Sequence, residues 1–250
     1  MIELLSSDEI EKMKAAGKLV AKVLEEVEKA VKPGVTTKEL DQIAYDIIVG
    51  AGGRPSCLNY GNPPFPATIC ASVNDEVVHG IPSTTRVLKD GDIVTVDVVA
   101  ELDGFNGDAA RTFCVGNVDE DTKLLIERTK EAFFKGFEQC KVGNRIGDVS
   151  YAVQQHAESF GYGVVRVLTG HGIGREMHMD PDVPNYGKPG RGARIKEGMA
   201  FCVEPMINRG TYNVELLDDE WTIVTADGKP SAHYENTIVM TADGPIMTTI

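Results

Sequence analysis

Lys89-Asp-Gly-Asp-Ile-Val-Thr-Val-Asp97-Val-Val-Ala100 is the stretch that decides the fold. Its second part, from Ile93 to Ala100, is rich in β-branched residues and apolar on both faces, which predicts a strand covered on two sides. Asp97 lies in the middle of that strand. A carboxylate buried there has to be paired with a cation or neutralised, because burying a lone charge is prohibitively costly.

A second carboxylate follows eleven residues later, at Asp108. The dipeptide Asp103-Gly104 between the two is a strong signal for a tight hairpin turn. Such a turn sets Asp97 opposite Ala110 and leaves Asp108 diagonally beside Asp97 on the same face. Two carboxylates close together on a buried surface repel each other unless something positive lies between them. The hairpin therefore predicts a metal site, whose other ligands must come from elsewhere in the chain.

The composition is that of an acidic protein long enough to bury a sizeable core. At 250 residues the chain forms one large domain or two small ones, and its net charge of −13 argues against a nucleic-acid-binding surface as the main feature. Its five cysteines form no C-x-x-C pair, so neither a disulfide framework nor a structural zinc site is indicated. The N-terminus lacks a basic segment followed by an apolar one, and no apolar run approaches about 18 residues. These features predict a cytoplasmic protein.

Helix and strand signals follow one another in a clear order. Ser6 and Thr36 each begin a capping box that opens an amphipathic helix, the first ended by Pro33-Gly34 and the second by Gly52-Gly53. A second helix pair is predicted at 121–140 and 146–160. Strand-like runs are predicted at 68–73, 93–100, 111–115, 164–168, 199–203, 221–225 and 236–240. The Pro-rich and aromatic loop at 54–66 is too long for a mere connector.

The pattern also repeats within the chain. The segment from Lys89 to Asp97 aligns with Lys196-Glu-Gly-Met-Ala-Phe-Cys-Val-Glu204, 107 residues later, and the glycines and apolar positions around the second helix recur 109 residues later. Each half thus contributes two helices and then a strand with a buried acid. We expect a duplicated α+β fold with a pseudo-twofold axis. It would form a single catalytic domain, 1–250, made of related halves at about 1–115 and 116–250, without an N-terminal extension.

The duplication brings together four acids in strand-like surroundings: Asp97, Asp108, Glu204 and Glu235. A lone buried acid is more often a hydrogen-bonded structural group than a ligand, but four acids arranged by a duplication favour a ligand set. His171, in a glycine-rich segment that leaves room for close approach, adds an imidazole. Mostly oxygen ligands with one nitrogen suit manganese, iron, cobalt or catalytic zinc, and bridging carboxylates would hold two ions about 3.5–4 Å apart.

Three more histidines lie close in sequence to these segments: His79, His178 and His233. His233 precedes Glu235 by two residues, so the two side chains share a face if that run is extended. Beside metal ligands, such imidazoles would orient the carboxylates or stabilise developing charge. His156, on the apolar stripe of the fourth helix, is instead expected to be a satisfied core histidine.

Over essentially its whole length the chain resembles the type I methionine aminopeptidases of metallopeptidase family M24. The motifs are Ser72-Val-Asn-Asp-Glu-Val-Val-His79-Gly-Ile-Pro, Gly91-Asp-Ile-Val-Thr-Val-Asp97, Asn106-Gly-Asp108, Gly170-His171-Gly-Ile-Gly-Arg, Val203-Glu204-Pro-Met and Tyr234-Glu235-Asn-Thr. The resemblance implies the pita-bread fold, in which a curved antiparallel sheet carries two helix pairs on its outer face. It also implies a hydrolase that removes the initiator methionine from nascent proteins when the second residue is small.

The resemblance also assigns site residues. The metal ligands would be Asp97, Asp108, His171, Glu204 and Glu235, with Asp108 and Glu235 bridging two divalent ions of cobalt, manganese, iron or zinc. Glu204 would also shuttle a proton, His178 would donate to the substrate carbonyl oxygen, and His79 would contact the scissile amide nitrogen. The substrate pocket maps onto apolar, aromatic or soft side chains around these two histidines: Cys57, Tyr60, Phe65, Cys70, Met177 and Trp221.

Three features depart from the family pattern or match it incompletely. Met177 stands where many bacterial relatives carry an aromatic residue, which would soften the far wall of the pocket. His233 stands where relatives often have a neutral polar residue, so it could alter the proton inventory of the site. Asn74 and Ser231 match a monovalent-cation site of the family, although few other residues fix that site in the sequence.

Other functions remain open alternatives at this level. Prolidases and Xaa-Pro aminopeptidases share the implied fold and metal set, but they usually carry a large extra N-terminal domain. Type II methionine aminopeptidases have a long insertion, whereas only 33 residues separate His171 from Glu204 here. A non-catalytic binding module of the same fold is a third alternative, although such relatives tend to lose metal ligands.

The implied partners are the N-termini of nascent polypeptides. The basic segment from Lys188 to Lys196 could dock near the ribosome's peptide exit, although short basic runs are more often solvated loops. No membrane or nucleic-acid partner is indicated. Since the sequence has no coiled-coil segment, we expect a monomer.

Overall fold

The computed structural model describes residues 2–250, and its longest paired segment is the hairpin of β4 (Ile93–Leu102) and β5 (Phe105–Cys114). Asp103 and Gly104 join the strands with φ values of 52° and 79°, which matches the left-handed two-residue turn that Asp-Gly favours. Asp97 pairs with Ala110, and Asp108 pairs with Val99. The predicted register is therefore confirmed, with both carboxylates diagonal to each other on one face.

The remaining elements surround this hairpin in two helix pairs and a set of shorter strands. In the first part of the chain these are α1 (Ser7–Ala30), α2 (Thr37–Gly50), β1 (Arg54–Pro55), β2 (Ile69–Val73), β3 (Glu76–Val78), α3 (Glu120–Phe137) and α4 (Ile146–Ser159). The strands that follow are β6 (Gly163–Val164), β7 (Thr169–Gly172), β8 (Met179–Pro184), β9 (Ala200–Val203), β10 (Met206–Asn208), β11 (Val214–Leu216), β12 (Ile223–Thr225), β13 (Ser231–His233), β14 (Asn236–Thr241) and β15 (Gly244–Met247).

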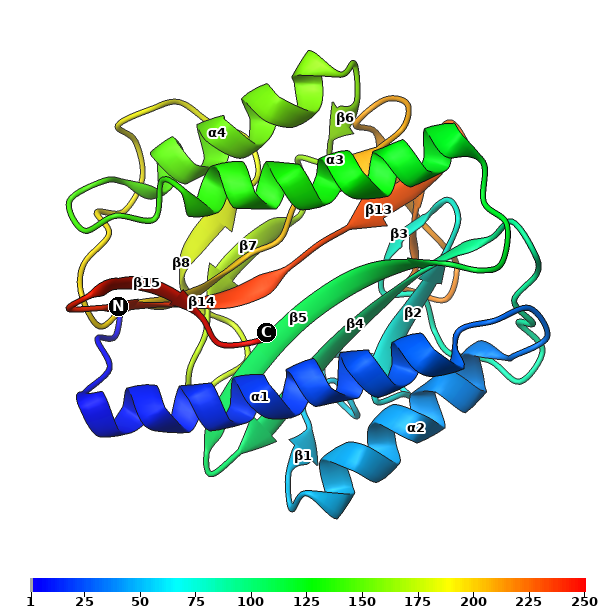
Figure 1. Cartoon of the computed structure of the whole chain (residues 1–250), viewed down its shortest axis with the longest axis horizontal. Coiled ribbons are helices and arrows are strands. Elements are labelled where there is room, and N and C mark those ends of the chain that lie inside the picture. The colour runs from blue at the N-terminus through cyan, green and yellow to red at the C-terminus, as the bar shows by residue number, and fades with distance from the viewer. Residues whose placement is uncertain (1) are drawn as a thin grey trace.

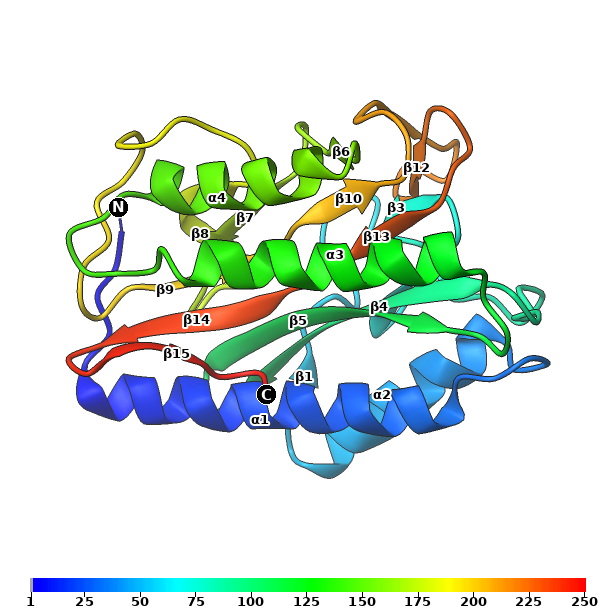
Figure 2. The ribbon, with the colours of Figure 1, turned by 45° about the horizontal axis from the view of Figure 1, so that its top comes forward.

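Two antiparallel sheets carry the helices. One contains β1, β4, β2 and β5, and the other runs β15-β14-β9-β7-β8. The helices α1 and α3 lie over the same face of these sheets, with β5 and β14 between them (Figures 1 and 2). Smaller sheets, β13-β10-β6 and β11-β12-β3, complete the described chain. This is the predicted α+β class with antiparallel sheets and two helix pairs.

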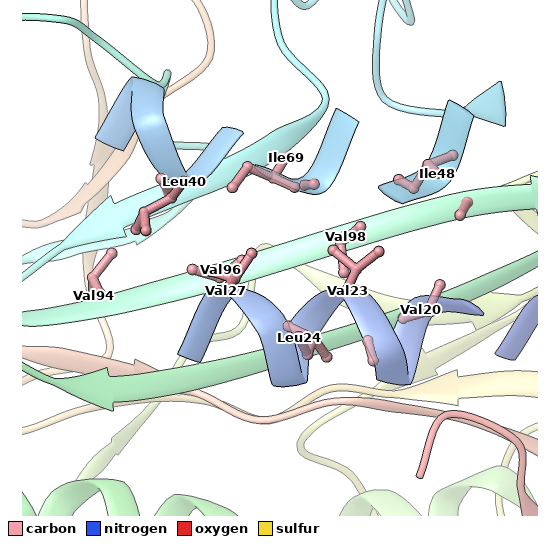
Figure 3. Close-up of a cluster of buried hydrophobic side chains, with 14 of the residues drawn as sticks. Val20, Val23, Leu24, Val27, Leu40, Ile48, Ile69, Val94, Val96 and Val98 are labelled. Atoms are coloured by element: carbon pink, nitrogen blue, oxygen red, sulfur yellow. The ribbon is translucent and has the colours of Figure 1, made fainter. Parts of the chain in front are cut away.

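Each helix pair has its own hydrophobic core. Apolar residues of α1 and α2 pack on β2 and β4, where Val23 and Val27 of α1 approach Val96 and Val98 of β4 (Figure 3). Apolar residues of α3 and α4 pack in the same way on β9 and β14, around Phe133 and Phe201. Because both helix pairs cover the outer face, the opposite face of the sheets is left for the polar residues.

The internal repeat has counterparts in the backbone. An isolated bridge joins Thr36 to Val87 in the first half, and the residues at equivalent positions, Arg145 and Arg194, form the same bridge in the second half. Three glycine pairs that the repeat aligns have positive φ in both copies: Gly34 and Gly143, Gly52 and Gly161, Gly91 and Gly198. The turns before β4 and β9 are therefore built alike, and each delivers an acid to the inner side.

Strand β5 meets β13 and β14 of the second half through threonine hydroxyls, and we call this contact the seam. The hydroxyl of Thr112 accepts a hydrogen bond from the amide of His233 and donates one to its carbonyl, both at 2.9 Å. The hydroxyl of Thr237 does the same for Asp108, at 3.0 and 2.9 Å. Arg111 reinforces this contact through the Asn236 side chain at 2.6 Å. Residues Asp108 and His233 are therefore held in place from the opposite half.

The structure differs from the sequence-based expectations in some strands. The strand expected at 111–115 begins at Phe105, and the one expected at 164–168 covers only Gly163–Val164. Strands β1, β3, β7, β8, β10, β11, β13 and β15 were not predicted, because they are short and, in β8, interrupted by proline. Among residues 2–250, no helix is both long enough and apolar enough to span a bilayer.

Candidate active site

A cavity of about 410 Å³ opens on the inner face of the sheets and receives side chains from both halves of the chain. All five predicted metal ligands line it: Asp97, Asp108, His171, Glu204 and Glu235. The predicted catalytic and pocket residues line it as well: Cys57, Tyr60, Phe65, Cys70, His79, Met177, His178 and Trp221. Residues spread over most of the sequence are thus brought to one place.

The four acids form the inner end of this cavity. Asp97 and Asp108 lie on β4 and β5, Glu204 directly follows β9, and Glu235 lies between β13 and β14. One oxygen of each is buried without a hydrogen-bond partner: Oδ1 of Asp97, Oδ1 of Asp108, Oε1 of Glu204 and Oε1 of Glu235. Buried carboxylate oxygens normally have partners, so four orphaned ones in one cavity need another explanation.

Burial raises the pKa of each of these carboxyl groups. The pKa of Asp97 rises to about 7 through desolvation. Those of Asp108, Glu204 and Glu235 rise well above their ordinary values, first through desolvation and then through the negative charge of the neighbouring acids. Ionising all four together without a cation is therefore very unfavourable. The donor set fits a divalent metal centre, because the attraction of a cation would offset both the cost of desolvation and the repulsion between the carboxylates.

His171 points at the same centre. Its Nδ1 lies 3.0 Å from the carbonyl oxygen of Gly172, which can only accept, so Nδ1 carries the proton. Its Nε2 is 3.6 Å from Oδ2 of Asp108 and 3.6 Å from Oε1 of Glu204. Burial lowers the pKa of His171 to about 4, so the ring is neutral. A lone pair that faces two carboxylates is the arrangement of ligands around a shared cation.

Close packing explains why glycines flank this imidazole. A side chain at residue 170 would collide with the carbonyl of Cys202, and one at residue 172 with the carbonyl of Asp180. The segment that carries His171 is thereby pressed between β8 and β9, which fixes the direction of the ring.

Cys202 is a neighbour of the centre that sequence reasoning did not identify. Ligand atoms of Asp108, His171, Cys202 and Glu235 all lie within 4.8 Å of one another, and all four residues are buried. Burial and the three nearby carboxylates raise the pKa of its thiol well above the ordinary value. The signal was present in the sequence, because Cys202 lies two residues before Glu204 and so shares its face of the strand.

Two further histidines line the same cavity as the acids. His178 Nδ1 is 2.7 Å from the hydroxyl of Tyr60, and its ring stacks edge-on with His171 at 4.3 Å between centroids. His79 has a positive φ of 59° and its ring lies 5.9 Å from that of Trp221. Its pKa is lowered to about 4, chiefly by burial and then by His178. Burial also lowers the pKa of His178 from its ordinary value. Both imidazoles are therefore oriented by neighbours, and burial favours the neutral form of each.

Apart from Thr169 and Asp182, the rest of the cavity lining is apolar. Phe65 and Trp221 meet edge to face with 5.2 Å between their ring centroids. Cys57, Cys70 and Met177 are buried in the same cluster. This wall offers thiol, thioether and aromatic surface, which suits a long apolar side chain with a polarisable atom.

Three of the other residues singled out from the sequence lie outside the cavity lining. His233 is buried behind the acids, with Nε2 3.8 Å from Oε2 of Glu235 and 4.0 Å from Oε2 of Glu204. Asn74 and Ser231 are adjacent, since the amide of Ser231 donates to the carbonyl of Asn74 at 2.9 Å.

His156 is partnered, as expected, but its side chain is 18% exposed, so it is not the core histidine that was predicted. It lies on α4 and does not line the cavity. Its Nε2 is 2.8 Å from a carboxylate oxygen of Glu131.

Comparison with known proteins agrees with this geometry. The model of metallopeptidase family M24 matches residues 11–242. A methionine aminopeptidase from Clostridium acetobutylicum is 52% identical over 250 residues, covering 100% of this chain and 99% of the relative. The crystal structure of methionine aminopeptidase from Rickettsia prowazekii superposes with a TM-score of 0.97 at 45% identity, with each chain fully covered. The fold is therefore the pita-bread fold.

A prolidase from Pyrococcus furiosus has the same fold with a TM-score of 0.79, but only 21% identity, and this chain covers 65% of it. That likeness is one of fold alone. The chain belongs to metallopeptidase family M24, and its kinship within that family is with the methionine aminopeptidases.

Proposed function

We propose that this protein is a metal-dependent aminopeptidase that hydrolytically removes the N-terminal methionine of nascent polypeptides whose second residue is small. One observation carries the proposal: four orphaned carboxylate oxygens and an imidazole lone pair converge at the inner end of a soft, apolar pocket. Full-length identity of 52% to a methionine aminopeptidase supports the same activity. The alternatives, a prolidase or Xaa-Pro aminopeptidase and a non-catalytic module, have no comparable sequence identity behind them; the prolidase from Pyrococcus furiosus is only 21% identical.

The residues that would hold metal are Asp97, Asp108, His171, Glu204 and Glu235, and we propose two divalent ions of cobalt, manganese, iron or zinc. Bound ions would supply Lewis-acid activation of a water molecule and a binding point for the free α-amine of the substrate. An internal peptide bond offers no such amine, which accounts for action at the chain terminus only. A monovalent cation near Asn74 and Ser231 remains a further prediction.

The protein groups have separate tasks in the proposed mechanism. Glu204 accepts the proton of the attacking water and passes it toward the leaving amine. His178 donates from Nε2 to the substrate carbonyl oxygen as charge develops, with its Nδ1 accepting a hydrogen bond from the hydroxyl of Tyr60 at 2.7 Å. His79 contacts the scissile amide nitrogen. Both histidines are neutral, so each can donate a hydrogen bond without adding charge to the site.

The methionine side chain would lie against Phe65 and Trp221, with the thiols of Cys57 and Cys70 and the thioether of Met177 around it. Sulfur and aromatic edges make favourable contacts with a thioether. Tyr60, 42% exposed, lies at the mouth of the pocket.

Peptide hydrolysis tests the proposal directly. The purified protein with manganese, iron or cobalt added is expected to cleave Met-Ala-Ser and to leave Met-Lys-Ser and Ala-Pro peptides intact. The products would be separated by chromatography, and a sample treated with a chelator gives the control. Equal cleavage of Xaa-Pro substrates lacking methionine would favour the prolidase alternative instead, and binding without cleavage would favour the non-catalytic module.

We also propose a cellular setting. Five unpaired cysteines suit a reducing compartment, so we place the enzyme in the cytoplasm, acting as a monomer on emerging chains. The basic segment 188–196 has its four cationic side chains exposed, and it would dock near the ribosome's peptide exit. Charge reversal at Lys188 and Arg191 should then reduce co-sedimentation with ribosomes at low salt. Unchanged co-sedimentation removes this part of the proposal.

A further inference from the structure

His233 is a buried polar group that the proposed mechanism does not use. Its side chain is 1% exposed, and neither Nδ1 nor Nε2 has a hydrogen-bond partner within residues 2–250. His156 shows the contrast, because its Nε2 contacts a carboxylate oxygen of Glu131 at 2.8 Å. His171 and His178 likewise have Nδ1 partnered, at 3.0 and 2.7 Å. Leaving both nitrogens of a buried imidazole unsatisfied is costly, so the ring needs a partner that it can reach.

The carboxylates of Glu204 and Glu235 are the groups within reach of this ring. Nε2 of His233 lies 4.0 Å from Oε2 of Glu204 and 3.8 Å from Oε2 of Glu235. Both distances exceed the length of a charge-assisted N–H···O bond by about 1 Å. The terminal torsion of a glutamate is broad, so a rotation of either carboxylate closes that gap. Since each glutamate also has an orphaned Oε1, neither carboxylate is held in its present orientation by a hydrogen bond to that atom.

The backbone holds His233 firmly while its ring stays free to donate. Thr112 contacts both the amide and the carbonyl of His233 at 2.9 Å, so the residue is fixed to the seam from the first half. Complete burial keeps the ring neutral, with one N–H and one lone pair. The proton is more stable on Nε2 than on Nδ1, because Nε2 faces the carboxylates of Glu204 and Glu235.

We infer that His233 is a positioning residue, whose Nε2–H holds the carboxylates of Glu204 and Glu235 in the orientation in which they face the metal ions. The inference rests on the proposed function, because it gives a task to a group behind the proposed ligands. It assigns to His233 the outer-shell donor that metal-binding carboxylates generally require. Donation to Glu204 has a second effect, since the donor leaves the other oxygen of that carboxylate to accept and release the substrate's proton.

Substitutions at position 233 separate this role from a purely structural one. His233→Gln keeps an N–H donor on a side chain of similar reach, whereas His233→Leu and His233→Met fill similar volume without a donor. We expect the Leu and Met variants to bind manganese at least about 10-fold more weakly in calorimetric titration of the metal-free protein. With metal saturating, their kcat should fall about 10–100-fold while KM for Met-Ala-Ser stays constant. The Gln variant should recover both quantities to within about threefold of the original protein.

Controls keep the outcomes distinct. His156→Leu removes a partnered histidine far from the cavity and should leave metal affinity and kcat unchanged, and circular dichroism identifies any variant that fails to fold. If the unsubstituted protein neither binds manganese nor cleaves Met-Ala-Ser, the proposed function fails, whatever the variants do. If it does both, and a folded Leu or Met variant equals it in metal affinity and kcat, the role of His233 is refuted. Loss of one ion from the stoichiometry in the Gln variant would also overturn the inference, because the imidazole would then be a ligand.

Discussion

At the residue scale, the site is built from buried acids whose charged form is disfavoured unless a cation lies close by. Asp97 lies in a strand of branched apolar residues, and burial raises its pKa to about 7. With that pKa and no cation nearby, the acid would be only about half ionised at pH 7. Four such acids lining one cavity are suited to share cations instead. The two histidines differ in which atom they present to the cavity. His171 directs a lone pair at the acids, whereas His178 has its Nδ1 engaged by Tyr60.

This division predicts different outcomes for two alanine substitutions. Asp97→Ala removes a proposed ligand, so the protein should lose metal and activity together. His178→Ala removes only a proposed donor to the substrate carbonyl, so the protein should keep its metal while kcat falls about 10²–10³-fold. Metal analysis by mass spectrometry and steady-state kinetics on both variants provide the test. A His178→Ala protein without metal would contradict the assigned role.

The pocket wall gives a second prediction at this scale. Trp221 packs edge-on against Phe65, and its Nε1 has no hydrogen-bond partner, so Trp221→Ala removes apolar contact without breaking a polar one. Loss of that contact costs about 1.5–3 kcal/mol of transition-state binding, or about 10–100-fold in kcat/KM for methionine peptides. Metal content should not change. Unaltered kcat/KM would mean that methionine does not lie against this ring.

At the element scale, helix α1 is pressed directly onto the sheet edge beneath the site. Gly17 of α1 lies against the backbone of Thr248, and a side chain at Gly107 of β5 would come within 2.8 Å of the Gly17 amide nitrogen. Gly107 precedes Asp108, so the close packing of α1 on β5 fixes the distance between the helix and the strand that carries this acid.

Two helical glycines therefore respond oppositely to alanine. Gly17→Ala forces α1 away from its neighbours and should lower the free energy of unfolding by about 1–3 kcal/mol. Gly50→Ala, at the end of α2, meets no atom within 4 Å and should raise stability by up to about 1 kcal/mol, since alanine restricts the unfolded chain. Urea unfolding of the two variants measures both effects. A Gly17→Ala protein as stable as the original would show that α1 can shift freely.

The extent to which sequence predicts this architecture differs between elements. The β4–β5 register followed from alternation and the Asp103-Gly104 turn, and the capping boxes at Ser6 and Thr36 are present at the first two helices. Strand β8 escaped prediction because two prolines interrupt Met179–Pro184, although Asp180 and Asp182 alternate with the less polar residues beside them. Cys202 escaped as well, since a cysteine within an apolar strand has the same sequence pattern whether its thiol packs in the core or lies beside carboxylates.

At the scale of the whole molecule, the proposed ligand set is divided between the halves. Asp97 and Asp108 come from the first half, and His171, Glu204 and Glu235 come from the second. Sequence could indicate this division through the repeat, but it could not give the distances, because these depend on how the two halves meet along the seam. A metal ion at this junction would connect the halves in addition to any chemistry.

Metal removal should therefore destabilise the fold. A ligand present at about 100 times its Kd stabilises by about 2.7 kcal/mol, which corresponds to roughly 5–10 °C in Tm for a chain of this size. Calorimetry with and without a chelator should show a decrease of this order for the unsubstituted protein. Asp97→Ala, with a proposed ligand missing, should show a much smaller decrease. An unchanged Tm after verified metal removal would contradict a bridging role.

The seam also affects how fast two backbone amides exchange hydrogen for deuterium. The amides of Asp108 and His233 donate to the hydroxyls of Thr237 and Thr112, not to backbone carbonyls. A hydroxyl can rotate away without disturbing either strand, so these two amides can meet deuterium through small openings that leave the ladders intact. Their exchange should slow when manganese is added, while amides in the middle of β4 remain unaffected. Deuterium uptake at two backbone positions would then report metal occupancy without any substrate.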